Sequence, residues 1–169
     1  FMMNNIDAQI ENTNAALTAR REMTGRTPAS QIIAPIGVWK DSFSEPQLVR
    51  HAERRVVYFG SMDARNGVPF LSEIFPIMLS RDSRLQIDVI GEGESSPLMA
   101  DLAKHFPTQF TLHGYMKEQG QIDQILRRSV VAIAPYDESP GSFTQFADPQ
   151  KLKYYASNGL PTVLTNVAP

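Results

Sequence analysis

Short runs of apolar residues alternate with amphipathic segments along the chain after residue 55. The runs are rich in β-branched residues and are bounded by Gly or Pro, which predicts buried strands at 56–60, 85–90, 110–114, 130–134 and 161–165. Between them, apolar residues recur at helical spacing and predict helices over 68–80, 97–106, 122–128 and 149–157. Alternating strands and helices indicate repeated βαβ units. We therefore predict an α/β fold, a Rossmann-like doubly wound parallel sheet with helices on both faces.

The first part of the chain lacks this regularity. Residues 5–23 carry Ile6, Ile10 and Leu17 at roughly helical spacing, which predicts a surface helix that ends near Gly25 and Pro28. A short apolar segment follows at 31–39, and the charged stretch 40–55 is interpreted as a connector with room for one helical turn. The chain opens without the basic segment and apolar run of a signal peptide.

Composition narrows the class of function. The 169 residues carry 16 Lys and Arg against 18 Asp and Glu, and this balance argues against a nucleic-acid binder. No apolar run approaches the length of a membrane span. The absence of cysteine excludes disulfides, a thiol nucleophile and a Cys-ligated zinc site. His51, His105 and His113 show no metal-ligand spacing, so we expect no bound metal and a cytoplasmic type of protein.

Candidate chemistry lies at the strand ends, because ligands of open α/β sheets bind beyond the carboxyl ends of the strands. The segments there are 60–67, 91–96, 114–117 and 135–148. The turn 60–67 leads into a helix whose N-terminus is suited to a phosphate, but an ordinary glycine-containing turn explains it equally. Neither a dinucleotide fingerprint nor a Walker loop is present.

The segment 135–148 is the most unusual connection. It joins a strand to a helix with about fourteen residues, where two to six are common, and loops of this length are usually functional or disordered. Its aromatic residues Tyr136, Phe143 and Phe146 argue against disorder. Asp148 and the following Pro149 predict a capped helix start. Lys151 then falls near anything bound at this end, although a solvated surface lysine remains the alternative.

Six segments in this order resemble the donor-binding half of a GT-B glycosyltransferase, most similar to the large retaining family 4. IIAPIGVW resembles the stretch that enters the C-terminal domain, VVYFGSMDARNG its first strand and turn, and LQIDVIGEGE, FTLHGYM and ILRRSVVAIAPY the strands that follow. The sharpest segment is DPQKLKYYASNGLPTVLT, which is similar to the family signature DPlKlyEYlAaGkPVVat. A flavodoxin-like signalling domain is disfavoured, because its phosphate loop or acidic cluster is missing.

The resemblance implies that this half binds a nucleotide-diphosphate sugar, with no metal and no further cofactor. Residues 1–30 would form a helix and connector from a preceding lobe, and 31–169 the C-terminal donor domain, cut short at its end. The residues that the resemblance places at the donor are Gly60, Ser61, Arg65, Asn66, Gly67, Gly91, Gly93, Tyr136, Ser139, Gly141, Asp148, Lys151, Leu152 and Tyr154. Glu138 lies near the acidic residue that such enzymes direct toward the donor sugar.

The match departs from the family at three of these positions. Ser61 stands where the family has an arginine, Asn66 where it has a lysine, and Tyr154 where a glutamate bonds the ribose. Two hypotheses follow. Donor binding uses Arg65, Lys151 and backbone N–H groups instead, or the domain is a non-catalytic binding or scaffold module.

On the first hypothesis, the full-length protein is a hexosyltransferase that transfers sugar to a glycan or other acceptor with retained anomeric configuration. The acceptor site would belong to an N-terminal lobe missing from this chain, so the isolated fragment would be inactive. We expect no nucleic-acid partner and no transmembrane segment. A cytoplasmic location at the inner face of a membrane, with peripheral contact, is compatible with this prediction.

Overall fold

A five-stranded parallel sheet forms the main body in the computed structural model, which describes residues 6–40, 43 and 54–166. The strand order is β5-β4-β3-β6-β7, and every neighbouring pair is parallel. The strands are β3 (Arg54–Phe59), β4 (Leu85–Ile90), β5 (Phe110–Gly114), β6 (Val131–Ala134) and β7 (Thr162–Leu164). The five predicted strands are confirmed, and β3 and β4 carry consecutive buried residues, as expected where a sheet is covered on both faces.

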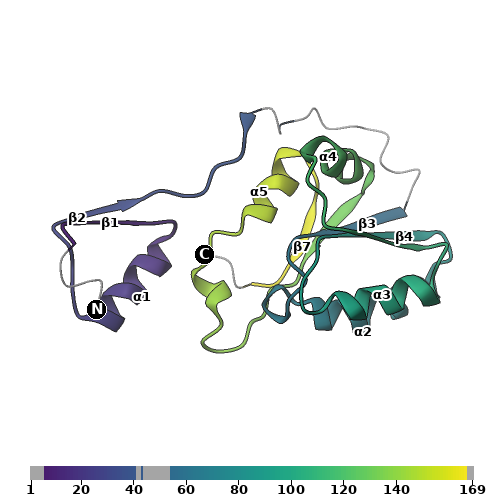
Figure 1. The fold of residues 1–169 in the computed structure, drawn as a ribbon, viewed down its shortest axis with the longest axis horizontal. Coiled ribbons are helices and arrows are strands. Elements are labelled where there is room, and N and C mark those ends of the chain that lie inside the picture. Colours follow the sequence, from purple (N-terminus) through teal and green to yellow (C-terminus); the bar gives the residue numbers. More distant parts are fainter. Residues whose placement is uncertain (1–5, 41–42, 44–53, 167–169) are drawn as a thin grey trace.

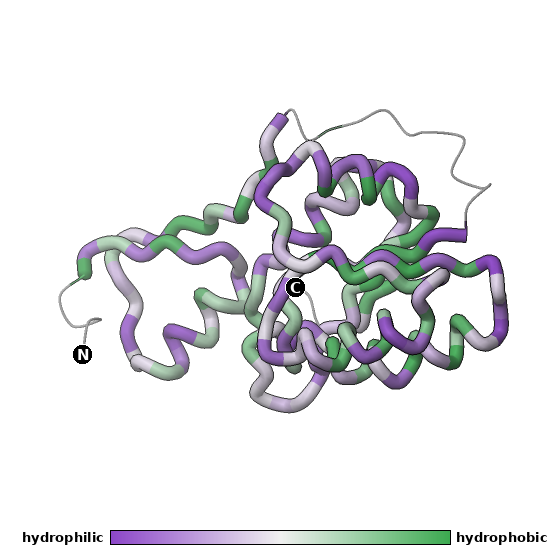
Figure 2. Tube along the Cα trace, turned by 45° about the vertical axis from the view of Figure 1, so that its right-hand side comes forward, coloured by the Kyte–Doolittle hydropathy of each residue, from purple (hydrophilic) through white to green (hydrophobic). Residues whose placement is uncertain are grey.

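Two helices cover each face of this sheet (Figure 1). The helices α2 (Val68–Arg81) and α3 (Ser96–His105) enclose one hydrophobic cluster, and α4 (Gln119–Arg128) and α5 (Gln150–Ser157) enclose the other. In the hydropathy view, green residues gather along the strands of the sheet, and the helices around it mix purple and green residues (Figure 2). The predicted Rossmann-like doubly wound sheet is therefore confirmed. The clearest difference in bounds is at α4, which begins three residues before the predicted start.

The N-terminal part forms a separate βαβ unit, which consists of β1 (Ala8–Glu11), α1 (Asn14–Thr24) and β2 (Ser30–Ile33) (Figure 1). The predicted helix over 5–23 is wrong in its first half, where β1 pairs in parallel with β2. This pairing depends on residues about twenty positions away, which a local periodicity cannot report. The helix begins where the Thr13 hydroxyl caps the Ala16 amide, and it ends at Gly25 as predicted. The predicted boundary between residues 30 and 31 falls inside β2.

Most of the predicted connector 40–55 lies outside the described residues, as does His51. Among the residues that the structure does describe, no helix is both long and apolar enough to cross a membrane.

The strand order creates a crevice at the carboxyl ends of β3 and β6. From β3 the chain proceeds to β4 and β5 on one side, and it then returns to β6 and β7 on the other. The connections after β3 and β6 therefore diverge, and such a switch point is where doubly wound sheets bind ligands. The turn after β3 contains a short 3-10 helix, η3 (Ala64–Asn66), and the long loop after β6 contains another, η4 (Phe143–Phe146).

Candidate functional site: a cavity at the switch point of the sheet

A cavity of about 450 Å³ lies between the turn after β3, the loop after β6 and the first turn of α5. We call it the switch-point cavity. It is lined by Phe59, Gly60, Ser61, Asp63, Arg65, Asn66, Tyr136, Phe143, Thr144, Ala147, Pro149, Gln150, Lys151 and Tyr154. Seven of these residues were predicted at the donor: Gly60, Ser61, Arg65, Asn66, Tyr136, Lys151 and Tyr154. The tertiary structure thus brings half of the predicted donor residues to one place.

Gly60 makes room for the lysine in this cavity. Its φ of +145° lies in a region that side chains rarely adopt, and a Cβ here would lie 2.9 Å from both Cε and Nζ of Lys151. The Gly60 amide bonds the carbonyl oxygen of Ile90, which holds the turn against β4. A glycine at this position therefore permits the strand end and the α5 side chain to approach each other.

Asp63 stabilises the turn that follows. One carboxylate oxygen accepts hydrogen bonds from the backbone and side-chain N–H groups of Asn66, at 3.0 and 2.8 Å, and the other accepts from the Ser61 hydroxyl at 3.0 Å. Burial opposes ionisation, but these bonds hold the pKa of Asp63 below its ordinary value. Arg65 lies 3.6 Å from the same carboxylate and is largely exposed.

The backbone N–H groups at the end of this turn are engaged within the chain, as in the ordinary turn that the sequence also allowed. The Asn66 amide bonds Asp63, the Gly67 amide bonds Ala64, and the Val68 amide contacts the Asp63 carbonyl oxygen at 3.5 Å. The next residue is proline, which has no N–H group. The physical reason is the Asp63 side chain, which caps the 3-10 helix that precedes α2. Gly67 itself packs against Pro135 and does not line the cavity.

Lys151 is the cation that the cavity holds in place. Its Nζ donates to Asn66 Oδ1 at 2.7 Å and lies 3.4 Å from the hydroxyl of Tyr58. It also lies 4.7 Å from the ring centre of Tyr58 and 4.8 Å from that of Tyr136. Burial lowers the pKa of Lys151 to about 7, although the charge of Asp63 opposes this shift. These contacts are not those of a solvated surface lysine.

Two tyrosines complete the surroundings of the ammonium group. The Tyr58 hydroxyl donates to the Ser61 carbonyl oxygen at 2.6 Å, and burial raises the pKa of Tyr58 well above its ordinary value. Tyr136 is only 6% exposed, and its buried hydroxyl has no hydrogen-bond partner within the described chain. Burial also raises the pKa of Tyr136, so both phenols stay neutral. The ammonium therefore faces aromatic rings and an amide oxygen rather than a carboxylate.

A second cavity of about 560 Å³ opens at the ends of β4 and β5, and we call it the strand-end cavity. It shares Phe59, Gly60, Ser61 and Tyr154 with the switch-point cavity. The rings of Phe59 and Tyr154 meet edge to face, with centroids 6.0 Å apart. The remaining lining residues are Ile90, Gly91, Glu92, Tyr115, Met116, Lys117, Gln119 and Ile122. The two cavities are thus adjacent spaces on either side of one aromatic wall.

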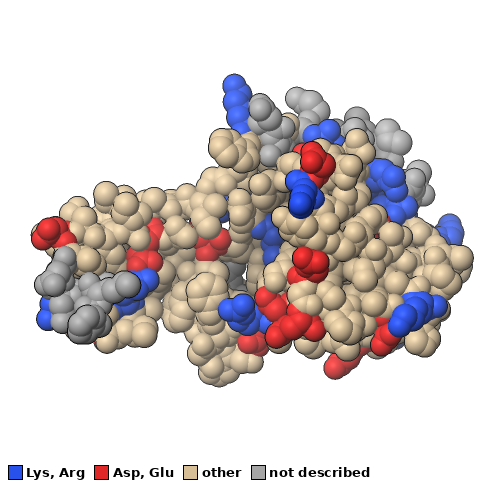
Figure 3. All heavy atoms as spheres, in the orientation of Figure 1, with Lys and Arg blue, Asp and Glu red and all other residues tan. Residues whose placement is uncertain are grey.

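A third space of about 530 Å³ separates α1 from the loop after β6. The surface is hollowed between the N-terminal unit and the main body (Figure 3). The Asp148 carboxylate lies here, where it accepts from the Ile36 amide at 2.5 Å and pairs with Lys153. The helix α5 begins after Pro149 without a side-chain cap, so the prediction of Asp148 as its cap is wrong. The carboxylate is engaged instead by Ile36 of the N-terminal segment and by Lys153 of α5 itself.

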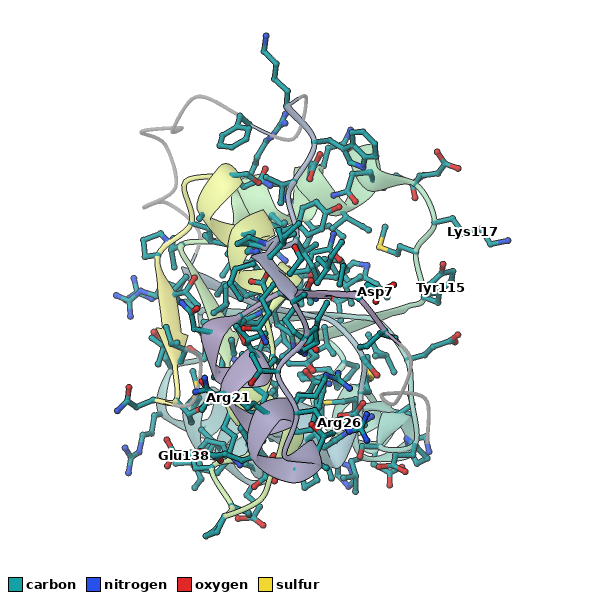
Figure 4. The ribbon with its side chains drawn as sticks, turned by 90° about the vertical axis from the view of Figure 1, so that its left-hand side faces the viewer. Asp7, Arg21, Arg26, Tyr115, Lys117 and Glu138 are labelled. Atoms are coloured by element: carbon teal, nitrogen blue, oxygen red, sulfur yellow. The ribbon has the colours of Figure 1, made fainter. Side chains whose placement is uncertain are left out.

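Several predicted donor residues lie outside both cavities. Glu138 accepts from the Asn166 amide at 3.1 Å, and Ser139 donates to Asp137 within the same exposed loop as Gly141. Figure 4 places Glu138 on the opposite side of the view from Tyr115 and Lys117. Gly93 packs against the Met62 backbone, and Leu152 packs into the cluster beneath α5. Any part these residues take in donor binding stays a prediction.

The sequence reasoning missed Tyr58, Phe59 and Asp63. The two aromatic residues belong to an apolar run that predicts a buried strand, so nothing distinguishes them from core residues. Asp63 does carry a signal in the sequence, because an aspartate in a turn commonly accepts a hydrogen bond from a backbone amide two or three residues later. The segment 114–117 was a candidate without assigned residues, and the structure places Tyr115, Met116 and Lys117 in the strand-end cavity. Within the described ranges, no three His, Asp or Glu side chains gather as they would around a metal ion.

Comparison with known proteins identifies a family and several solved structures that this chain resembles. The family model described as "Glycosyl transferases group 1" matches residues 53–169. A mutant of S. aureus TarM in complex with fondaparinux, α-GlcNAc-glycerol and UDP has a TM-score of 0.70 at 14% identity, over 97% of this chain and 31% of that one. HepE from Anabaena in complex with UDP and glucose has a TM-score of 0.68 at 15% identity, over 96% of this chain and 45% of that one.

WaaG, a glycosyltransferase involved in lipopolysaccharide biosynthesis, has a TM-score of 0.66 at 16% identity, over 94% of this chain and 44% of that one. At such identities the likeness shows the fold, which is that of a GT-B lobe. The chain spans between about a third and a half of the length of these structures. No curated protein matches the sequence.

Proposed function

The chain belongs to the group 1 glycosyl transferase family, and from this premise we propose that its switch-point cavity binds the diphosphate of a nucleotide-diphosphate sugar. The sugar-transfer domain would then act as the donor-binding part of a larger enzyme. Retention of configuration and the hexose class rest on the resemblance to family 4 and belong to this proposal. So does the absence of a metal or other cofactor from the reaction.

The observation that carries the proposal is the environment of Lys151. An ammonium group in this position is largely removed from water. The charge of Asp63 favours its protonated form, yet no carboxylate of the described chain forms an ion pair with it. Burial of a charge without an opposite charge is unfavourable, and an anion in the cavity would remove this cost. A diphosphate has the charge and the acceptor oxygens to do so.

The position of this cation also compensates for a departure from the family pattern. Asn66 stands where the resemblance expects a lysine, and Lys151 Nζ lies 2.7 Å from its side-chain oxygen. The positive charge thus occupies the neighbourhood of the missing lysine, although it comes from another helix. This supports re-formed donor binding over a domain that has lost its site.

A phosphate-binding cation at this point suits the chemistry of sugar transfer. The negative charge on the diphosphate increases as the bond to the sugar breaks, and a fixed cation in a water-poor cavity stabilises it. Arg65 supplies a second, solvent-exposed charge at the rim. The structural neighbours are two to three times as long as this chain, so we propose that acceptor binding and turnover need residues outside it. Glu138 lines neither cavity, so the proposal assigns it no role at the donor sugar.

Calorimetric titration of the chain with UDP, GDP and ADP tests the proposal. We expect one of them to bind, and the substitution Lys151→Met to abolish the heat. Lys104→Met is the matched control, because Lys104 lies on the exposed side of α3 and pairs only with Asp101. If none of the three nucleotides binds to the folded chain, the proposal is wrong and a non-catalytic binding or scaffold module is the better interpretation.

A further inference from the structure

Tyr154 is the side chain that divides the two adjacent cavities. With Phe59, Gly60 and Ser61 it belongs to the lining of both. Its ring lies edge to face with that of Phe59. A ligand that extends from one cavity to the other must therefore pass along this wall.

The two cavities differ in the groups they offer. The switch-point cavity contains the half-buried cation Lys151, whereas the strand-end cavity has an apolar floor of Ile90, Met116 and Ile122. A nucleoside diphosphate is linear, with its base, its ribose and its diphosphate in that order. If the diphosphate binds Lys151, the apolar floor receives the base. The ribose then lies between them, against Tyr154.

The shared wall offers no carboxylate to the ribose. The carboxylates among the lining residues are Asp63 and Glu92. Both carboxylate oxygens of Asp63 already accept hydrogen bonds from Ser61 and Asn66. Glu92 is exposed and lines only the strand-end cavity. A carboxylate can accept from both hydroxyls of a ribose at once, but a phenol has a single hydroxyl. The wall therefore recognises a sugar ring by contact rather than by its hydroxyl pair.

We propose that Tyr154 makes this site indifferent to the 2′-hydroxyl, so that 2′-deoxyribonucleoside diphosphates bind about as tightly as ribonucleoside diphosphates. The inference rests on the proposed nucleotide binding, but it concerns the selectivity of the site rather than its existence. A hydrogen bond to a charged acceptor changes affinity by on the order of tenfold or more when it is lost. Without such a bond, the two ligand series should differ by less than about threefold.

The test compares UDP, GDP and ADP with their 2′-deoxy forms by calorimetric titration. For whichever base binds, we expect affinities of the ribo and deoxy forms within about threefold of each other. Tyr154→Glu should restore selectivity and favour the ribo form by about tenfold or more, because it places a carboxylate at the wall. Tyr154→Phe is the control and should leave the ratio near that of the unaltered protein.

The outcomes separate the two proposals. Binding of a ribonucleotide with a tenfold or greater loss for its deoxy form would overturn the inference and leave the proposed function intact. If Glu92→Gln then removed that selectivity, the ribose would be shown to meet Glu92 instead of Tyr154. Failure of every ribonucleotide to bind would overturn the proposed function, and the inference with it. The measurement on the unaltered protein decides the question even if Tyr154→Glu does not fold.

Discussion

The two walls of the switch-point cavity hold their cations in opposite ways. On the turn after β3, Arg65 is exposed and lies beside Asp63, whose carboxylate also accepts from the N–H groups of Asn66. On α5, Lys151 is half-buried against Tyr58 and Tyr136 and forms no ion pair with a carboxylate of the described residues. The difference shows that Asp63 already lies beside the cation of the turn. The need for an external anion lies on the α5 wall.

Removal of the buried cation should have the largest effect. Lys151→Met takes away the charge that the diphosphate would pair with, and we expect nucleotide affinity to fall by on the order of 100-fold. The same substitution should raise the melting temperature of the free chain, because a buried unpaired ammonium is replaced by an apolar side chain of similar length. Titration and thermal denaturation measure the two effects. A loss of binding together with a loss of stability would contradict this account.

A side chain at residue 60 should disturb the same cation from the opposite wall. Gly60→Ala places a Cβ against Lys151 and imposes a strained φ, so we expect about 1–3 kcal/mol lower stability and about tenfold weaker nucleotide binding. Gly120→Ala is a matched control in α4, where a Cβ meets no atom within 4 Å. Urea denaturation and titration distinguish the two positions. Equal effects of both alanines would show that Lys151 does not depend on the space at Gly60.

The pH dependence tests whether the cation is needed in its charged form. Because the pKa of Lys151 is lowered to about 7, the free chain loses this charge as the pH rises, while a bound diphosphate would retain it. Nucleotide affinity should therefore fall on the order of tenfold between about pH 7 and about pH 8.5. Titrations across this range would show it, and Lys151→Met should lack the dependence. A flat profile in the unaltered protein would contradict a role for the ammonium.

The lowered pKa of Lys151 also makes the stability of the fold depend on pH, and stability should rise with pH where nucleotide affinity falls. The folded chain binds fewer protons at Lys151 than the unfolded chain between pH 7 and the ordinary lysine pKa of 10.5. This group therefore destabilises the fold fully below pH 7, and its penalty decreases as the pH rises toward 10.5. Comparison of the unaltered chain with Lys151→Met isolates this contribution by urea denaturation. A penalty that grew with pH would mean that the pKa is raised.

The exposed cation should contribute least. Arg65→Ala removes a charge that solvent and Asp63 already screen, so we expect at most about threefold weaker nucleotide binding and no change in stability. The effect should vanish at high salt, because exposed charges are screened there. Titration at low and high salt provides the measurement. A loss as large as that of Lys151→Met would invert the comparison between the two walls.

The pattern of residues predicted most of the architecture because it is local. The strands of the main sheet are short segments rich in apolar residues, and the helices repeat apolar residues at helical spacing, so neighbours along the chain carry the signal. The strand β1 escaped because its four residues, Ala8–Glu11, do not form an apolar run. Asp148 was misassigned because its partner Ile36 is 112 positions away.

For the candidate site, the sequence determined that strand ends 60–67 and 91–96 and helix 149–157 carry polar and glycine residues suited to a phosphate ligand. The sequence motifs were also sufficient to identify the resemblance to a glycosyltransferase family. The tertiary structure alone decided that Lys151 reaches Asn66 across 85 positions, that Asp63 occupies the turn, and that Tyr154 separates two cavities. The physical reason is that burial, pKa and ion pairing depend on distances between segments, and only the packed sheet sets those distances.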